Sequence, residues 1–384
     1  MGGFACCPAA QSEDLSLEVA LFPYLVDPEG FQEAVCDSWV QRHPDVELHF
    51  TDWNCYHSDP VEGIDVFVFE STYLTSFAEK GYLLPIPEDI IKDRDDIFPY
   101  TIDGCHVDGT LYALPQLLCA DFLFTRKGDG ELAGVTDIEG LYRVLGDRKE
   151  ETVILGENEG LLADPSNKAR KYLDVLTDEQ QKYSDYGTLP DVSDLSAVAV
   201  EKLRELRKMS GEGLVRYLTE NKGKSALLPE WFADGKGRAY IGYSESMAKM
   251  GDAAGQMDIR LFFYSDRKNI LVFYTDLVGI SAEIDEERKE LAYELANILL
   301  SEEVLTQMSM PGEESGSPQY LLTVRSSVYD HLEKEFHIYA KLKEIVENPD
   351  NHVFRAGSGV REFIKAADAA LTEALTEEEL AAAA

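Results

Sequence analysis

The feature that most constrains the fold is the run Ile-Asp-Val-Phe-Val-Phe at residues 64–69, which is apolar except for Asp65. Such a run is typical of a strand buried on both faces of a parallel sheet. An earlier β-rich stretch at 17–22 precedes Asp27 and Pro28, which give an N-cap and a first helical residue for a helix over 28–42. Strand, helix and strand therefore alternate, which predicts an α/β lobe with ligand residues at the carboxyl ends of its strands. Those ends carry Tyr24, Asp52, Trp53, Tyr56 and Glu70.

The 384-residue chain is longer than one hydrophobic core usually serves, so we expect two lobes. A second lobe is predicted to begin after Pro115. Its helices are predicted at about 137–145, 168–176 and 195–209. Further along the chain, apolar periodicity, strand-forming runs and Gly- or Pro-bearing turns predict a strand followed by a turn over 237–246, a short helix at 246–250, a strand at 270–280, and helices at about 286–300, 326–346 and 360–375.

The formal charge of −37 argues against binding to nucleic acid or to anionic membranes, and no run of Lys and Arg supplies a basic patch. The six cysteines show no C-x-x-C spacing, so we expect free thiols in a reducing compartment. The first residues lack the pattern of a secretory signal, which favours an intracellular, cytoplasmic protein. Gly2, Cys6 and Cys7 leave open acylation of the N-terminus, which would anchor the chain to a membrane.

Two motifs are incomplete. Gly223-Lys224-Ser225 resembles the end of a phosphate loop, but Leu218 occupies the position of the required glycine. The Gly242–Ser246 segment imitates a nucleophile elbow, yet it ends in Ser where Gly is needed. The histidines have no metal-ligand spacing. We therefore expect no metal, no nucleotide and no cofactor.

Cys119 is the candidate nucleophile. It lies in the stretch 112–128, which predicts a strand that runs between the two lobes. The alternative is a structural role, because a free Cys is among the most buried residue types and behaves as a small hydrophobe.

Two resemblances to known families bear on the choice between a catalytic and a structural role for Cys119. The segments 77–85, 109–115 and 123–128 resemble two-lobed periplasmic binding proteins of the maltose-binding type. A further set of segments, in the same order along the chain, is similar to the thiaminase I family: 50–60, 114–119, 237–247, 273–276 and 318–322. The resemblance extends from Leu17 to about Leu375.

The resemblance implies an α/β fold of the type II periplasmic-binding-protein kind. Each lobe would be a mixed sheet flanked by helices, with an active-site cleft between the lobes. The expected division is a disordered leader at 1–14, a first lobe of 15–117 plus 275–317, a second lobe of 118–274 plus 318–380, and a tail at 381–384.

It also implies a monomeric transferase that needs no cofactor or metal. In this family a Cys adds to the unsubstituted ring carbon of the thiamine pyrimidine, the thiazole departs, and an external amine or thiol replaces it. Cys119 matches the nucleophile and Glu245 the acid/base residue. The matched substrate-binding positions are Tyr24, Tyr56, Glu70, Tyr243, Tyr274 and Asp276. Three positions depart from the family pattern: Glu70 replaces an Asp, and Phe22 and Ala226 replace tyrosines.

These residue types suit the chemistry. A thiol with a pKa of about 8.5 needs a neighbouring base near neutral pH, and burial would raise the pKa of Glu245 into a useful range. Tyrosine rings offer faces to a flat, cationic heteroaromatic substrate. The structural alternatives are that Glu245 stabilises a helix start, that Asp276 pairs with an Arg, and that the tyrosines fill a hinge. The alternative function is a solute-binding protein that carries out no catalysis.

Overall fold

The computed structural model describes residues 15–149, 153, 155–180, 186–265, 271–312 and 316–382, with side chains up to 376. The expected leader at 1–14, with Gly2, Cys6 and Cys7, lies outside the described residues, as do the last two residues of the expected tail. The described chain divides into two compact units. The first contains residues from 15–119, 186–188 and 272–360, and the second contains residues from 120–180, 189–265 and 361–382.

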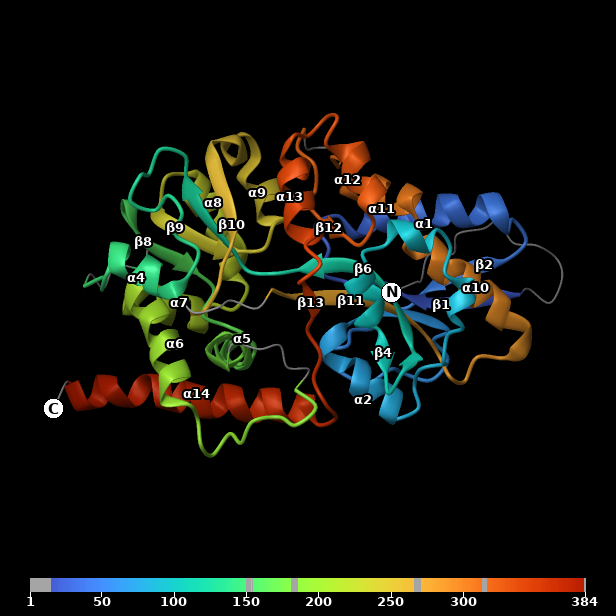
Figure 1. Ribbon diagram of the computed structural model, residues 1–384, viewed down its shortest axis with the longest axis horizontal. Coiled ribbons are helices and arrows are strands. Elements are labelled where there is room, and N and C mark those ends of the chain that lie inside the picture. Colours follow the sequence, from blue (N-terminus) through green and yellow to red (C-terminus); the bar gives the residue numbers. More distant parts are fainter. Residues whose placement is uncertain are drawn as a thin grey trace. The chain divides into compact units, whose positions relative to one another are not determined.

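In the part of the first unit that the structure describes, seven strands form one mixed sheet, ordered β12-β6-β11-β3-β1-β2 with β13 beside β11 (Figure 1). Both β2 and β3 run parallel to β1, whereas β11 is antiparallel to β3 and to β6. The apolar run at 64–69 is therefore confirmed as a strand beside a parallel neighbour. The strands are β1 (Ser16–Ala20), β2 (Glu47–Phe50), β3 (Val66–Glu70), β6 (Ala113–Cys119), β11 (Val272–Ile280), β12 (Leu322–Thr323) and β13 (His352–Val353).

Helix α1 begins as the sequence predicts. The Asp27 side chain accepts a hydrogen bond from the Gly30 backbone N–H at 2.9 Å, and Pro28 is the first helical residue. Trp39 of this helix is fully buried and donates its indole N–H to the Val46 carbonyl at 2.9 Å, which fixes the turn into β2. The α-helices of the first unit are α1 (Pro28–Arg42), α2 (Leu74–Glu79), α3 (Pro99–Asp103), α10 (Glu286–Leu299), α11 (Glu302–Ser309), α12 (Ser326–Leu332) and α13 (Ile338–Val346).

The second unit has its own sheet, ordered β10-β7-β9-β8, with β8 parallel to β9 and the other pairs antiparallel. Its strands are β7 (Phe122–Arg126), β8 (Glu157–Ala163), β9 (Gly237–Gly242) and β10 (Met257–Leu261). Its α-helices are α4 (Ile138–Leu145), α5 (Lys168–Gln180), α6 (Ala197–Ser210), α7 (Glu212–Glu220), α8 (Leu228–Ala233), α9 (Ser246–Met250) and α14 (Val360–Ala382). A separate ribbon pairs β4 (His106–Val107) with β5 (Thr110–Leu111) in the first unit.

The expected lobe boundaries need correction. Residues 318–360 were assigned to the second lobe, but they belong to the first unit, because β12 pairs with β6 and β13 pairs with β11. For the same reason, all of β6 and β11 belong to the first unit, and the chain passes into the second unit after Cys119. The predicted helix at 326–346 is interrupted between α12 and α13, and α14 continues through Ala382 into the expected tail.

Cysteine pairing also departs from the expectation. Cys55, Cys105 and Cys119 are free thiols, whereas Cys36 on α1 is disulfide-bonded. Across the described ranges, no helix has the length and apolar character needed to cross a membrane.

Candidate functional site

Six of the eight predicted site residues lie on the first unit, around one edge of its sheet. Because β6 and β3 are both antiparallel to β11, their carboxyl ends reach the same edge, where β11 begins. Cys119 is the last residue of β6 and Glu70 is the last residue of β3. Tyr24 and Tyr56 lie in the segments that follow the parallel strands β1 and β2. We call Tyr24, Tyr56, Glu70, Cys119, Tyr274 and Asp276 the strand-end group.

Strand pairing puts four of these side chains on one face of the sheet. Cys119 is directly opposite Tyr274, and Glu70 is directly opposite Asp276. Directly opposed residues share a face, and Tyr274 and Asp276 are two apart on β11 and so share it as well. A partly exposed thiol therefore lies on the same face as two opposed carboxyl groups.

Glu70 is held in place by two hydroxyl groups. The Tyr56 hydroxyl donates to Glu70 Oε2 at 2.7 Å, and the Thr72 hydroxyl donates to Glu70 Oε1 at 2.6 Å. Burial, followed by the charges of Glu70 and neighbouring groups, raises the pKa of Tyr56 well above its usual value, so this phenol remains a donor near neutral pH. Each oxygen of Glu70, which stands where an Asp was expected, thus accepts a hydrogen bond from one hydroxyl group.

Aromatic rings border these carboxylates. Phe22 contacts Tyr24 and Tyr56 edge-on, with ring centroids 5.7 and 6.3 Å away. Tyr24 is largely exposed, and its hydroxyl accepts a hydrogen bond from the Asn54 side-chain amide at 2.7 Å. Phe22 therefore keeps the ring surface of the tyrosine expected at this position while lacking its hydroxyl.

Tyr274 has a supporting role in the first unit. It is buried, and its ring stacks on Phe354 with centroids 4.5 Å apart. Phe354 in turn contacts the ring of Tyr186 at 5.9 Å. Since Tyr274 is directly opposite Cys119, this stack fixes the strand position beside the thiol.

The other two predicted residues, Tyr243 and Glu245, lie on the second unit in the turn between β9 and α9. Gly242 begins this turn, and a Cβ there would lie 2.0 Å from the Tyr240 hydroxyl, so a side chain would not fit without a shift. The Tyr240 and Ser246 hydroxyls are hydrogen-bonded at 2.9 Å, which joins the strand to the helix below the turn. We call Tyr243 and Glu245 the turn pair.

Glu245 has the electrostatic character expected of a proton acceptor. Burial raises the pKa of this carboxyl group, while its own backbone N–H, the Ser244 hydroxyl and the charges of Arg170 and Lys249 oppose the rise. Although Glu245 is the residue that precedes α9, its side chain does not cap that helix. The structural alternative of a simple helix-start carboxylate is therefore less favoured.

Sequence reasoning missed several residues that contact the predicted site. Thr72, Asn54 and Phe354 contact members of the strand-end group, and Arg170 contacts Tyr243. Only Thr72 had a local signal, because it follows Glu70 by two residues. Ala226, by contrast, is exposed on a short 3-10 turn of the second unit.

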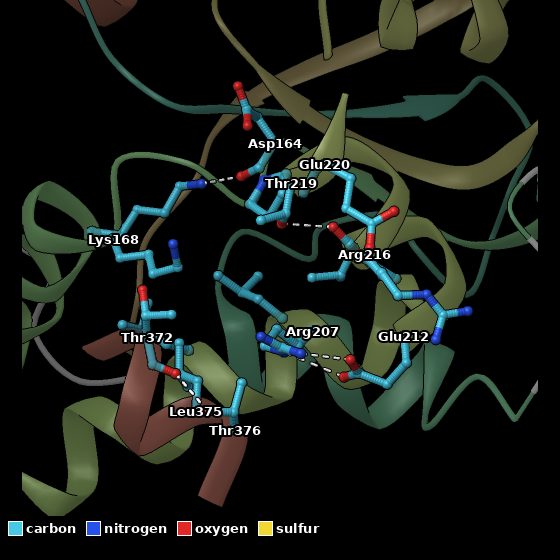
Figure 2. Close-up of a pocket in the computed structure, with 17 residues that line it drawn as sticks. Asp164, Lys168, Arg207, Glu212, Arg216, Thr219, Glu220, Thr372, Leu375 and Thr376 are labelled. Carbon is cyan, nitrogen blue, oxygen red and sulfur yellow. Dashed lines mark hydrogen bonds and ion pairs between the residues drawn. The ribbon is translucent and has the colours of Figure 1, made fainter. Parts of the chain in front are cut away.

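A cavity of about 350 Å³ lies elsewhere on the second unit (Figure 2). Its walls come from α5, α6, α7, α14 and the residues after β8, and neither member of the turn pair lines it. Two of its cations are already engaged: Arg207 pairs with Glu212 at 2.5 Å, and the Lys171 amine donates to the Asp164 carbonyl. Within the described residues, no three His, Cys, Asp or Glu side chains form a group that could hold a metal ion.

The two mixed sheets with flanking helices define the class of protein as the α/β fold of periplasmic binding proteins. The maltodextrin-binding protein MalE1 of L. casei BL23 is similar with a TM-score of 0.63 over 96% of this chain and 95% of that one. Its sequence identity is 16%, so the likeness concerns the fold alone. The expected fold class is confirmed.

Comparison with enzymes is more specific. Thiaminase-1 of Paenibacillus thiaminolyticus is 40% identical over 367 residues, covering 95% of this chain and 89% of that protein. The solved structure of Clostridium botulinum thiaminase I in complex with thiamin has 40% identity and a TM-score of 0.90, covering 94% of this chain and 100% of that one. The thiaminase-1 domain model matches residues 120–265. The chain belongs to the thiaminase I family, which confirms the resemblance and the expectation of an enzyme.

Proposed function

We propose that this protein cleaves thiamine and transfers the pyrimidinylmethyl unit to an external amine or thiol, with Cys119 as the nucleophile. The observation that carries the proposal is the face shared by the Cys119 thiol and the opposed carboxyl groups of Glu70 and Asp276. Like charges directly opposed on a sheet destabilise it, and a bound cation relieves that repulsion. The thiazolium of thiamine is such a cation, and the tyrosine rings offer it stacking faces.

The proposed reaction begins when Glu245 accepts the proton of the Cys119 thiol. The thiolate adds to the unsubstituted pyrimidine carbon, and the electron pair displaced from the ring moves to a ring nitrogen, which takes a proton from the carboxyl group of Asp276 or Glu70. The bond between the methylene carbon and the thiazolium nitrogen then breaks, and its electron pair neutralises the thiazolium. The external nucleophile adds to the methylene carbon, and the ring nitrogen returns its proton to the carboxylate as the Cys119 thiolate leaves, which restores the aromatic ring. The thiolate then takes back the proton held by Glu245.

The test of function is consumption of thiamine by the purified protein, followed chromatographically, with and without an added nucleophile. We expect thiamine to disappear and free thiazole to form only when pyridine, aniline or a thiol is supplied. Saturable thiamine binding with no product under any of these conditions would overturn the proposal in favour of a solute-binding protein.

Glu245→Gln is expected to lower kcat/KM for thiamine by about 100- to 10,000-fold, the usual contribution of a general base. Because the base must be ionised, and burial raises the pKa of Glu245, the wild-type rate should fall as the pH decreases through that raised pKa. The residual rate of the Gln variant should lack this acidic limb. Glu230→Gln, at an exposed position on α8, is the matched control and should retain both the rate and the limb.

Tyr56→Phe is expected to raise the KM for thiamine about tenfold, since a hydrogen bond to a charged group contributes about 1.5 kcal/mol or more. The variant removes the donor 2.7 Å from Glu70 and keeps the ring. Tyr82→Phe is the control, because its hydroxyl also donates to a carboxylate, Asp59, outside the strand-end group. Steady-state kinetics that give equal KM values for both variants would contradict a role of Tyr56 in binding.

The monomeric state and the intracellular location expected from the sequence stay predictions.

A further inference from the structure

We propose that Arg170 is a positioning residue for the turn pair, orienting Tyr243 and holding Glu245 in its ionised, proton-accepting form. This inference rests on the proposed role of Glu245. The Arg170 guanidinium lies over the Tyr243 ring, with its central carbon 5.7 Å from the ring centroid. One of its N–H groups also donates to the Tyr243 hydroxyl at 3.4 Å. A guanidinium can contact a ring and a hydroxyl together because it is planar and carries several donors.

The first turn of α5 holds Arg170 in a fixed place. The backbone N–H of Ala169 donates to the Asp368 carboxylate of α14 at 2.8 Å. On the other side, the Lys171 amine donates to the carbonyls of Asp164 and Ser166. The residues before and after Arg170 are therefore both anchored, so its side chain extends from a rigid point of the backbone.

The turn that receives this side chain is equally constrained. Gly242 leaves no room for a Cβ, and the bond between Tyr240 and Ser246 closes the base of the turn. Glu245 follows Tyr243 by two residues within this turn. The Arg170 guanidinium, which contacts Tyr243, is consequently held in a fixed position relative to the Glu245 carboxylate as well.

The charges around Glu245 come from several elements. Arg170 of α5 and Lys249 of α9 lower its pKa, as do the Ser244 hydroxyl and its own backbone N–H, against the larger effect of burial. Tyr240 of β9 also faces it: burial first, and then the Glu245 charge, raise the pKa of that phenol, which therefore stays neutral. Lys249 is exposed to solvent, so its charge is screened more than that of the partly buried Arg170. Arg170 is accordingly the main cation acting against the burial of Glu245.

The experiment compares pH profiles of kcat/KM for thiamine in the wild type, Arg170→Gln, Arg170→Lys and Lys168→Gln. In Arg170→Gln, the midpoint of the acidic limb should move up by about 0.5 to 1 pH unit, because an opposite charge nearby is lost. Arg170→Lys restores the charge and should return the midpoint close to the wild-type value. Lys168→Gln removes a cation from the same helix that faces the separate cavity, and it should leave the midpoint unchanged.

Each outcome decides whether Arg170 acts on the ionisation of Glu245 or only supports the local structure. A lower plateau in Arg170→Gln with an unmoved midpoint would overturn the inference, because a merely structural residue would give that result. A midpoint shift of equal size in Lys168→Gln, or no recovery in Arg170→Lys, would also overturn it. Failure of the wild-type protein to cleave thiamine would instead overturn the proposed function, and this is seen before any variant is made.

Discussion

Replacing Cys119 with serine is expected to lower thiamine turnover by at least about 1,000-fold while leaving the fold intact. The hydroxyl group is close to the thiol in size, and Cys119 is at the partly exposed end of β6, so the sheet loses no packing. Serine is a far weaker nucleophile, because its hydroxyl is much harder to deprotonate than a thiol. Turnover measured with pyridine as co-substrate gives the loss directly.

Cys105→Ser is the matched control for this variant. Cys105 is also a free thiol of the first unit, but it is fully buried and donates to the Thr101 carbonyl at 3.2 Å. Burial raises the pKa of its thiol far above the usual range, so it should be unreactive. A Cys119→Ser protein that retains turnover would refute the proposed nucleophile.

The difference in burial between Cys119 and the other thiols of the first unit predicts that a reagent will label Cys119 selectively. Iodoacetamide should modify Cys119 ahead of Cys55 and Cys105, which are 1% and 0% exposed. In the wild type, mass spectrometry during turnover should find a pyrimidinylmethyl adduct on the peptide that contains Cys119. Its presence on another peptide would assign the nucleophile elsewhere.

The early part of the fold could be predicted from the sequence because its signals are local. Asp27 and Pro28 specify the start of α1, and the apolar run before Glu70 specifies a buried strand. Strands β12 and β13 are two residues long each, which is too short for any alternation to be recognised. Their placement depends on pairing with β6 and β11, distant in sequence, and this is why residues 318–360 were assigned to the wrong lobe.

The candidate site shows the same limit. Cys119 was a candidate from its place in a predicted strand, and the resemblance to a family favoured its catalytic role and selected Glu245, whereas the neighbours of both residues depend on tertiary structure. Arg170 lies 73 residues before Tyr243 in the sequence, and a lone Arg at the start of a helix carries no local signal of its partner. Thr72, in the middle of the 3-10 turn at 71–73, is close to Glu70 in sequence, but its hydrogen bond to Glu70 depends on β3 ending at Glu70.

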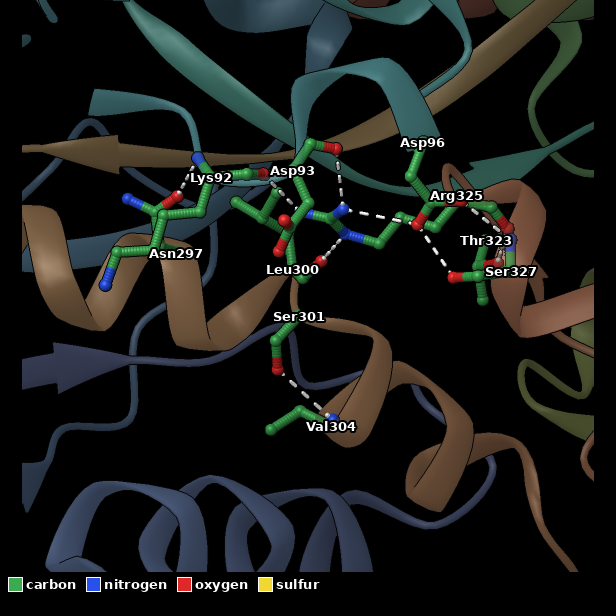
Figure 3. A network of polar contacts seen from close by, with 10 residues as sticks. All are labelled: Lys92, Asp93, Asp96, Asn297, Leu300, Ser301, Val304, Thr323, Arg325 and Ser327. Atoms are coloured by element: carbon green, nitrogen blue, oxygen red, sulfur yellow. Dashed lines mark hydrogen bonds and ion pairs between the residues drawn. The ribbon is translucent and has the colours of Figure 1, made fainter. Parts of the chain in front are cut away.

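Arg325→Met is expected to destabilise the first unit by about 3 to 5 kcal/mol, the usual result of removing one partner from a buried ion pair. Arg325 is 2% exposed, and its guanidinium donates to the carbonyls of Leu300, Asp93 and Lys92 at 2.5, 3.1 and 2.9 Å. It also pairs with the Asp96 carboxylate at 3.3 Å (Figure 3). Methionine fills much of the volume but leaves these acceptors without a donor.

The network joins the segment 92–96 to α10 and α12. Asp96 also accepts hydrogen bonds from the Ser327 backbone N–H and hydroxyl, which tie it to the first turn of α12. Asn297 of α10 accepts from the Lys92 backbone N–H at 2.9 Å (Figure 3). Loss of Arg325 should therefore loosen the end of α10 and the start of α12 together.

Urea unfolding followed by tryptophan fluorescence tests this prediction in a Trp231→Phe background. Trp231 belongs to the second unit, so the remaining Trp39 and Trp53 report on the first. The unfolding midpoint should fall by about 1 to 1.7 M, given a urea slope of about 3 kcal/mol per M, because the slope rises with the surface exposed on unfolding and the first unit is large. Arg94→Met is the control, because Arg94 pairs with Glu88 at the exposed surface and such pairs contribute about 1 kcal/mol or less. If both variants unfolded at the same urea concentration, the Arg325 network would have no special stabilising role, and cohesion of the first unit would rest on its apolar core.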